Sequence, residues 1–155
     1  MARKLLRSTP TITAGAYSAK DAIGQLMSVD RAARNGKGGV INSITILDKG
    51  EIAPDLAIYF FTDEVTAPAD NAAQAYSDAD LAAYLIGVLK ITTEDLTAEL
   101  GAGNVQAITT LRNLNLGFVL PPNKNKLWYQ FGNLGDTPTY IAVDDLTLIL
   151  DISAE

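Results

Sequence analysis

The sequence contains no cysteine and no histidine among its 155 residues. The missing cysteines exclude disulfides, thiolate catalysis, iron–sulfur clusters and zinc sites built on thiolates. The missing histidines remove the commonest general base, every catalytic triad that relies on imidazole, and the commonest transition-metal ligand. Carboxylates, amines, guanidinium groups, phenols and hydroxyls remain for chemistry. We therefore expect a protein that is not an enzyme, with no catalytic residue, no metal and no cofactor.

Long hydrophobic segments are missing as well. No apolar run is long enough to cross a bilayer. The first apolar residues are interrupted by Arg7, Ser8, Thr9 and Pro10 before the core of a signal peptide can form. We expect a protein made in the cytoplasm with no membrane partner. A chain of this length is most simply one domain, and it can bury enough surface to support its own core.

Positive charge is in short supply, and it is unevenly distributed. The chain has 12 Lys and Arg against 18 Asp and Glu, a formal net charge of -6, which argues against a nucleic-acid partner. Residues 1–37 nevertheless carry 7 basic and only 2 acidic side chains. This basic segment either pairs with the acidic remainder of the chain or forms an arm that reaches an acidic partner. Its first three basic residues, Arg3, Lys4 and Arg7, are candidate partner-interface residues.

Glycine and proline separate short runs that are rich in β-branched and aromatic residues, a rhythm typical of an all-β sandwich or barrel. Residues 1–10 are expected to be an irregular N-terminal arm, and residues 11–155 a single β-sandwich domain. The pair Asn35–Gly36 suits a two-residue hairpin turn because both positions need positive φ. It predicts a hairpin between strands over residues 25–33 and 40–47.

The second strand of this hairpin alternates, and the alternation favours Val40, Asn42, Ile44 and Ile46 as its core face. The remaining expected strands cover residues 11–13, 56–62, 85–91, 107–120, 127–131, 140–143 and 146–152. About eight strands is the number of a two-sheet jelly roll, so the expected fold class is an all-β sandwich of jelly-roll type.

One or two short helices are expected beside the strands. Ser77 followed by Asp78 and Asp80 is an N-cap signature with acids in the first turn, which predicts a helix over about 78–83. A second helix near residues 93–96 is an alternative to a loop there. Asp70 with Asp78 and Asp80 offers oxygen ligands, but turn and helix-start roles explain these acids without a calcium ion.

Two runs of aromatic residues give further interface candidates. In residues 56–61, Tyr59 and Phe61 share one face, which is either buried or set against a partner. In residues 127–131, Trp128 is opposite in phase to Leu127, Tyr129 and Phe131. Its indole therefore lies either in the core or at an interface, where tryptophan is enriched. Tyr59, Phe61 and Trp128 complete the set of candidate interface residues.

Several phrases of the sequence resemble small structural proteins of tailed-bacteriophage particles. They are residues 9–17 (TPTITAGAY) with 21–24 (DAIG), 39–49 (GVINSITILDK), 56–61 (LAIYFF), 70–73 (DNAA), 77–81 (SDADL), 138–140 (PTY) and 145–148 (DLTL). Together they touch most of residues 9–152. The resemblance is to capsid decoration, or cement, proteins, and it supplies no catalytic signature.

This resemblance implies a protein that binds the major capsid protein non-covalently at the outer surface of a virion and stabilises the shell. It also implies contact with copies of itself, as a trimer or a dimer. Two alternatives stay open: a tail or neck protein of a phage particle, and a carbohydrate-binding jelly roll such as an adhesin. An exposed aromatic platform beside carboxylates would favour the carbohydrate-binding alternative.

Overall fold

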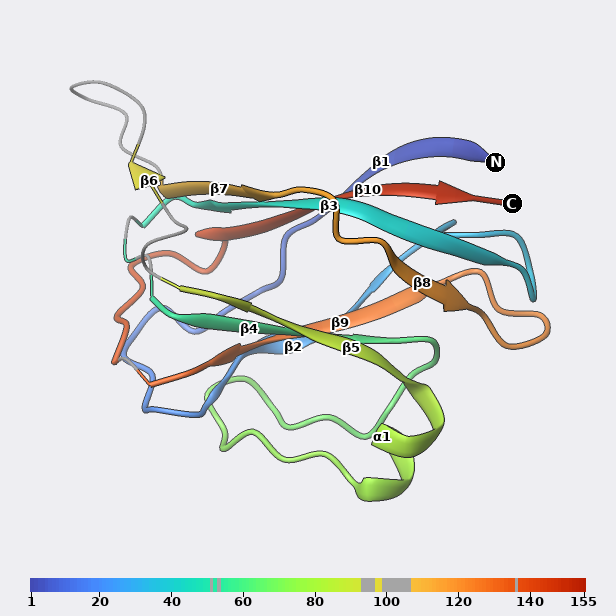
Figure 1. Ribbon diagram of the computed structural model, residues 1–155. Helices are drawn as coiled ribbons and strands as arrows, with labels where there is room; N and C mark the ends of the chain where they lie inside the picture. Colours follow the sequence, from blue (N-terminus) through green and yellow to red (C-terminus); the bar gives the residue numbers. More distant parts are fainter. Residues whose placement is uncertain (51, 53, 93–96, 99–106, 136) are drawn as a thin grey trace.

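The protein consists of two antiparallel β-sheets that face each other (Figure 1). The computed structural model describes residues 1–50, 52, 54–92, 97–98, 107–135 and 137–155. In chain order the elements are β1 (Ala2–Ser8), β2 (Ala22–Val29), β3 (Gly38–Asp48), β4 (Leu56–Phe61), α1 (Asp78–Tyr84), β5 (Leu85–Ile91), β6 (Thr97–Ala98), β7 (Ala107–Leu111), β8 (Leu116–Val119), β9 (Leu127–Asn133) and β10 (Leu146–Ala154).

The strand pairs are nested in the chain. β1 pairs with β10, β2 with β9, β3 with both β7 and β8, and β4 with β5. These pairs form one sheet in the order β1-β10-β3-β7-β6, with β8 also on β3, and a second in the order β2-β9-β4-β5. Successive nested pairs thus alternate between the two sheets, which is the winding of a jelly roll. The predicted fold class, an all-β sandwich of jelly-roll type, is confirmed.

The core lies between the sheets and is built from the inward faces of central strands. Leu127, Tyr129 and Phe131 of β9 are fully buried, as are the alternate residues of β10 from Leu146 to Ile152. The opposite phase of Trp128 to Leu127, Tyr129 and Phe131 was predicted from alternation and is confirmed. Full burial of such a side chain is worth about 1.5–3 kcal/mol, so these strands supply much of the stabilising energy.

The predicted core face of β3 is only half right. Ile44 and Ile46 are fully buried, but Ile41 is buried in place of Val40 and Asn42. The cause is a β-bulge: Asp151 of β10 pairs with Ser43, and the next residue, Ile152, pairs with Ile41. The skipped position is Asn42. An extra residue in one strand inverts the alternation beyond it, which a period-two pattern cannot show.

The predicted hairpin across Asn35–Gly36 was wrong. A turn does form there, with the amide of Lys37 donating to the carbonyl of Arg34 at 2.9 Å. However, β2 and β3 belong to different sheets, so the connection crosses from one sheet to the other. Only Gly36, with φ of 69°, has positive φ, whereas the expected hairpin turn needs it at both positions.

The predicted irregular arm over residues 1–10 was also wrong. Residues Ala2–Ser8 form β1, and every residue of this strand is paired with β10. The sequence of this strand carries three basic residues and gives a weak alternation, so its pairing with a strand almost 150 residues away was not evident. The expected strands at 11–13 and 140–143 are not strands; nearby, Ala16 and Thr139 form an isolated bridge.

Residues 107–120 form two strands rather than one. Asn113 and Asn115, between β7 and β8, have φ of 57° and 49°, and these left-handed positions interrupt the extended chain. The described residues therefore contain ten strands instead of about eight, of which β6 has two residues. The alternative of a second helix over 93–96 falls outside the described residues.

A long segment, residues 62–77, covers the outer face of the β2-β9-β4-β5 sheet together with α1 (Figure 1). Gln130 of β9 is fully buried and fixes this segment. Its side-chain amide donates to the carbonyls of Gly24 and Pro68, both at 2.9 Å, and its oxygen accepts from the hydroxyl of Tyr76 at 2.7 Å. The segment before the helix is therefore fixed to the sheet by hydrogen bonds.

Asp70 provides a second anchor for this segment. Its carboxylate accepts hydrogen bonds from the hydroxyl of Thr13 at 2.5 Å, the hydroxyl of Tyr17 at 2.7 Å and the amide of Gly24 at 2.6 Å. The predicted helix is confirmed as α1, with the Ser77 hydroxyl accepting from the amide of Asp80. No described helix is long and apolar enough to cross a membrane.

Candidate functional site

The six candidate interface residues do not meet in one place. Arg3, Lys4 and Arg7 lie on β1 at the edge of one sheet, whereas Tyr59, Phe61 and Trp128 lie on the outer face of the other sheet. Each group must therefore be considered separately.

The three aromatic candidates are largely covered by the protein itself. The ring of Tyr76, from the covering segment, packs on Tyr59 and Phe61 with centroid distances of 5.1 and 5.3 Å. Phe61 is fully buried, Tyr59 is half-buried, and Trp128, which pairs with Phe61 across the strands, is also half-buried. Large hydrophobic side chains that are exposed in the described residues are all aliphatic: Met1, Leu5, Val88, Val119, Ile141 and Val143.

On β1, Arg3 is bound within the chain. Its guanidinium donates twice to Asp151 of β10, from Nε to Oδ1 at 2.9 Å and from Nη2 to Oδ2 at 2.6 Å. This bidentate contact holds the pKa of the Asp151 carboxyl below its usual value. Arg7 lies on the same face of β1, four residues further along the strand, and is exposed. The alternative in which the basic segment pairs with the chain's own acids therefore holds for Arg3.

We expect the contribution of the Arg3–Asp151 pair to depend on pH. Because the folded pKa of Asp151 is depressed, its stabilisation is complete above the unfolded value of about 3.9. It disappears as the pH falls through the lower folded pKa. Arg3→Gln should therefore reduce the free energy of unfolding at pH 7, and this loss should become smaller as the pH falls below about 3.9, measured by urea titration. An equal loss at every pH would show that charge is not the cause.

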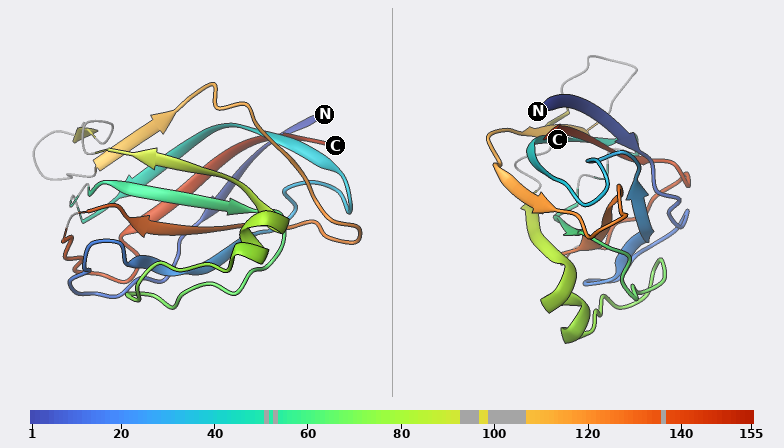
Figure 2. Two further views of the ribbon diagram at one scale, coloured as in Figure 1. Left: turned by 60° about the horizontal axis from the view of Figure 1, so that its bottom comes forward. Right: turned by 90° about the vertical axis from the view of Figure 1, so that its right-hand side faces the viewer.

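Lys4 points to a different neighbour. Its ammonium group donates to the main-chain carbonyl of Arg31 at 2.8 Å, which joins β1 to the connection between β2 and β3. This connection carries Arg31, Arg34 and Lys37, all of them exposed. We call the four residues Lys4, Arg31, Arg34 and Lys37 the basic end. It lies at the end of the sandwich that carries both chain termini and the connection between β8 and β9 (Figures 1 and 2).

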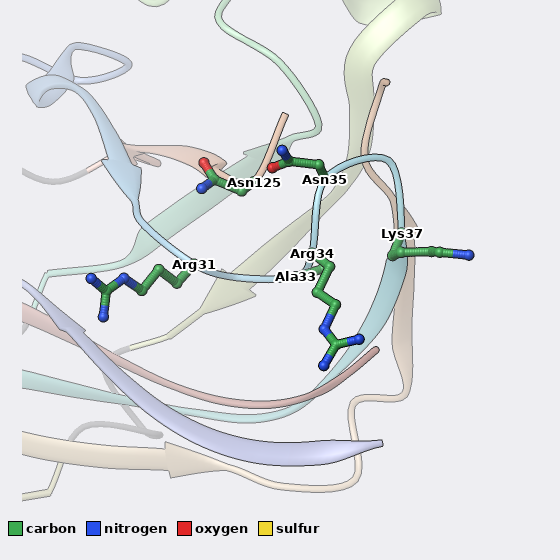
Figure 3. Close-up of a pocket in the computed structure, with 6 residues that line it drawn as sticks. All are labelled: Arg31, Ala33, Arg34, Asn35, Lys37 and Asn125. Atoms are coloured by element: carbon green, nitrogen blue, oxygen red, sulfur yellow. The ribbon is translucent and has the colours of Figure 1, made fainter. Parts of the chain in front are cut away.

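An open pocket of about 520 Å³ is part of the basic end (Figure 3). Arg31 and Arg34 extend from one side of the β2–β3 connection, the amide side chains of Asn35 and Asn125 lie on the other side, and Lys37 points away from them. Ala33 completes the lining. A second depression of about 510 Å³ shares Arg34 and Lys37 with the first and reaches Lys4, Ala154 and Glu155.

The backbone that carries these side chains is held on two sides. The amides of Ala32 and Gly36 donate to the carbonyls of Asn125 and Lys124 at 3.0 and 3.2 Å. On the other side the amide of Arg34 donates to the carbonyl of Glu155 at 3.0 Å. Ala32 and Ala33 are buried in the core, so the connection is packed as well as hydrogen-bonded.

Arg31 has a left-handed backbone with φ of 60°. Such a conformation is unfavourable for a side chain other than Asn, Asp or Gly, and residues of this kind gather at functional sites. Here it turns the chain between β2 and the buried Ala32. Asparagine or glycine would fill this position with less strain.

Charge at this end is only partly neutralised. Lys124 pairs with Asp63 at 2.9 Å and Lys126 with Asp30 at 3.2 Å, and Glu155 lies beside Arg34 and Lys37. Within the described residues, no side chain of the basic end has a carboxylate within ion-pair distance. Clustered guanidinium and ammonium groups with amide donors form an arrangement that binds anionic groups.

No family model matches the sequence, and no curated protein matches it. Among solved structures, a chain of Desmodium yellow mottle tymovirus is similar at 15% sequence identity and a TM-score of 0.28. The match covers 97% of this chain and 85% of that chain. A TM-score this low carries no argument, so function is best argued from the chain's own surface.

Sequence reasoning identified part of this site. The excess of basic residues in 1–37 included Arg31, Arg34 and Lys37, but only Lys4 of the basic end was named as an interface residue. Nothing in the sequence marked Asn125, which is almost 90 residues further along the chain. Its place beside the β2–β3 connection results from the pairing of β2 with β9.

Proposed function

We propose that this chain is a non-enzymatic structural protein of a bacteriophage particle that decorates the outside of the capsid. The observation that carries this proposal is the basic end of an acidic protein: three cations on the β2–β3 connection and Lys4 on β1, none of which has a carboxylate within ion-pair distance among the described residues. Such a surface suits docking onto an acidic patch of the major capsid protein, where complementary charge guides association. The resemblance of several phrases within residues 9–152 to decoration proteins supports the same role.

A decoration protein also contacts copies of itself, and we propose a trimer or dimer on the virion surface. A symmetric oligomer would multiply a weak single contact, because each further contact becomes intramolecular once the first has formed. The carbohydrate-binding alternative is less well supported, since the exposed hydrophobic side chains are aliphatic and the aromatic residues are covered.

The test is sedimentation of the purified protein with undecorated phage capsids, after its mass in solution has been measured by light scattering. We expect the protein to co-sediment and Arg34→Glu with Lys37→Glu to abolish co-sedimentation, because repulsion replaces attraction at the contact. Lys20→Glu with Lys90→Glu is the matched control. Both lysines are exposed at the opposite end of the sandwich, where the main-chain amide of Lys20 donates to the carbonyl of Asn133 and Lys90 of β5 is paired with Ala57 of β4.

Two outcomes would contradict the proposal. A protein that stays in the supernatant with every capsid tested has no decorating role. A protein that co-sediments equally well in all three forms binds the shell through some other surface, and the basic end then no longer supports the function.

A further inference from the structure

We propose that the basic end binds an extended acidic peptide segment, with Arg31 and Arg34 receiving its carboxylates and the amides of Asn35 and Asn125 receiving its main chain. This inference deepens the proposed function, because the segment would belong to the shell protein. The recognition itself depends only on side chains that line one pocket.

Two arginines three residues apart suit carboxylates. A guanidinium group presents its donors in a planar fork that matches both oxygens of one carboxylate, unlike the point charge of lysine. Arg31 and Arg34 project from the same side of the connection, so they can engage two acidic side chains of one segment (Figure 3). Lys4 adds a third cation beside Arg31, since its ammonium group is held on the carbonyl of that residue.

The two asparagines supply a different recognition element. Each side-chain amide offers both donors and an acceptor, as a peptide group does. Asn35 and Asn125 come from separate connections and lie together in the pocket, across the β2–β3 connection from the arginines. A fully ionised inorganic anion can accept from the cations and from the amide N–H groups, but it has no N–H for the amide oxygens, whereas a peptide main chain offers both donors and acceptors.

The site is arranged before binding. Hydrogen bonds from Ala32, Arg34 and Gly36 to two other segments fix the connection, and the buried alanines anchor it in the core. Arg31 has a left-handed backbone with φ of 60° within this fixed connection. A fixed backbone reduces the entropy lost when a ligand binds, which matters for a short segment with few contacts.

Charge favours an acidic protein segment over a nucleic acid. The basic end contains four of the 12 Lys and Arg residues. The rest of the chain therefore has eight basic side chains and all 18 acidic ones. A long polyanion would extend over this acidic surface and be repelled, while a short segment would meet only the basic end. The open pocket of about 520 Å³ also fits a few residues rather than a duplex.

The experiment titrates the protein with a peptide of six glutamates at low salt and measures binding by calorimetry. We expect saturable binding that weakens as salt is added. Arg31→Asn with Arg34→Gln should reduce the affinity at least about tenfold, since it removes both guanidinium groups. Asparagine suits the left-handed backbone at position 31, so this variant is expected to fold, and circular dichroism with thermal unfolding checks that it does.

The matched control is Lys20→Asn with Lys90→Gln. Lys20 also has a left-handed backbone, with φ of 68°. The control therefore introduces the same two residues, with asparagine again at a left-handed position, and it also removes two positive charges. We expect its affinity for the peptide to equal that of the unmodified protein. A second variant, Asn35→Ala with Asn125→Ala, keeps every charge and is expected to weaken peptide binding without changing the salt dependence.

Inorganic phosphate and single-stranded DNA of six nucleotides serve as comparison probes. Binding of either one as tightly as the peptide would overturn the inference, as would equal peptide affinity in the arginine variant and the lysine control. The result is separable from the capsid experiment. Capsid binding without peptide binding rejects the peptide site alone, while peptide binding without capsid binding rejects the decorating role.

Discussion

Removal of residues 2–8 is expected to unfold this protein rather than shorten a tail. The seven residues of β1 are paired with β10 along their whole length, and Leu6 packs against the core. Each backbone hydrogen bond contributes about 0.5–1.5 kcal/mol net, and a domain is stable by only about 5–15 kcal/mol. Loss of a complete strand therefore removes a large part of the free energy of unfolding.

Circular dichroism and urea unfolding of the deletion variant test this expectation. Leu5→Thr is the control, because Leu5 is 66% exposed and its replacement leaves the backbone pairing in place. The control should unfold at nearly the urea concentration of the unmodified protein. A deletion variant with an unchanged unfolding midpoint would mean that β1 is a dispensable arm, as the sequence alone suggested.

Alkaline unfolding is the second large effect that we expect. Tyr17, Tyr129 and Tyr140 are at most 1% exposed, and burial raises the pKa of each phenol well above its usual value. For Tyr17 and Tyr140 the neighbouring Asp70 and Asp48 add to this rise. These phenols stay protonated in the folded protein at pH values where they ionise in the unfolded chain.

The direction in which pH changes the free energy of unfolding follows from the difference between the folded and unfolded pKa values. Folded pKa values above the unfolded value of about 10 leave stability unaffected below pH 10 and reduce it as the pH rises further. Each such phenol costs about 1.4 kcal/mol per pH unit, so three together cost about 4 kcal/mol per unit. We expect a cooperative loss of circular dichroism above pH 10, accompanied by a step in phenolate absorbance. If all six tyrosines ionise near pH 10 while the fold persists, the explanation fails.

Tyr140→Phe offers a control for this titration. The Tyr140 hydroxyl is buried and has no hydrogen-bond partner in the described part of the chain. Its removal therefore leaves no donor or acceptor unsatisfied, and stability at pH 7 should be unchanged or higher. The alkaline midpoint should move upward because one of the three buried phenols has been removed.

Sequence patterns predicted the secondary structure correctly where it depends on residues that are close together in the chain. β4, β5 and β9 were expected from runs of β-branched and aromatic residues, and the structure has them close to the expected bounds. α1 was expected from Ser77 and the acids that follow it, and its cap is formed as predicted. In each case the side chains that decide the conformation are within a few residues of one another.

The failures involve partners that are remote in the chain. Asn35–Gly36 does form a turn, but whether its flanking strands pair depends on β9 and β10, which take β2 and β3 as neighbours. The bulge at Asn42 likewise appears only in the register against β10. The basic excess of residues 1–37 was visible, yet the contact of Lys4 with Arg31 arises from the folded arrangement of the two sheets.

The nested order of the strands has a consequence for biosynthesis. Arg3 and Asp151, which are joined across β1 and β10, are 148 residues apart in the chain. A ribosome adding about 5–20 residues per second needs roughly 7–30 seconds to make that intervening chain. During this time β1 and β2 are unpaired, because their partner strands β10 and β9 are the last of the ten described strands to be made. The β1–β10 and β2–β9 pairs can therefore form only after β9 and β10 have been made, and such non-local pairing is slow and leaves unpaired strands open to aggregation.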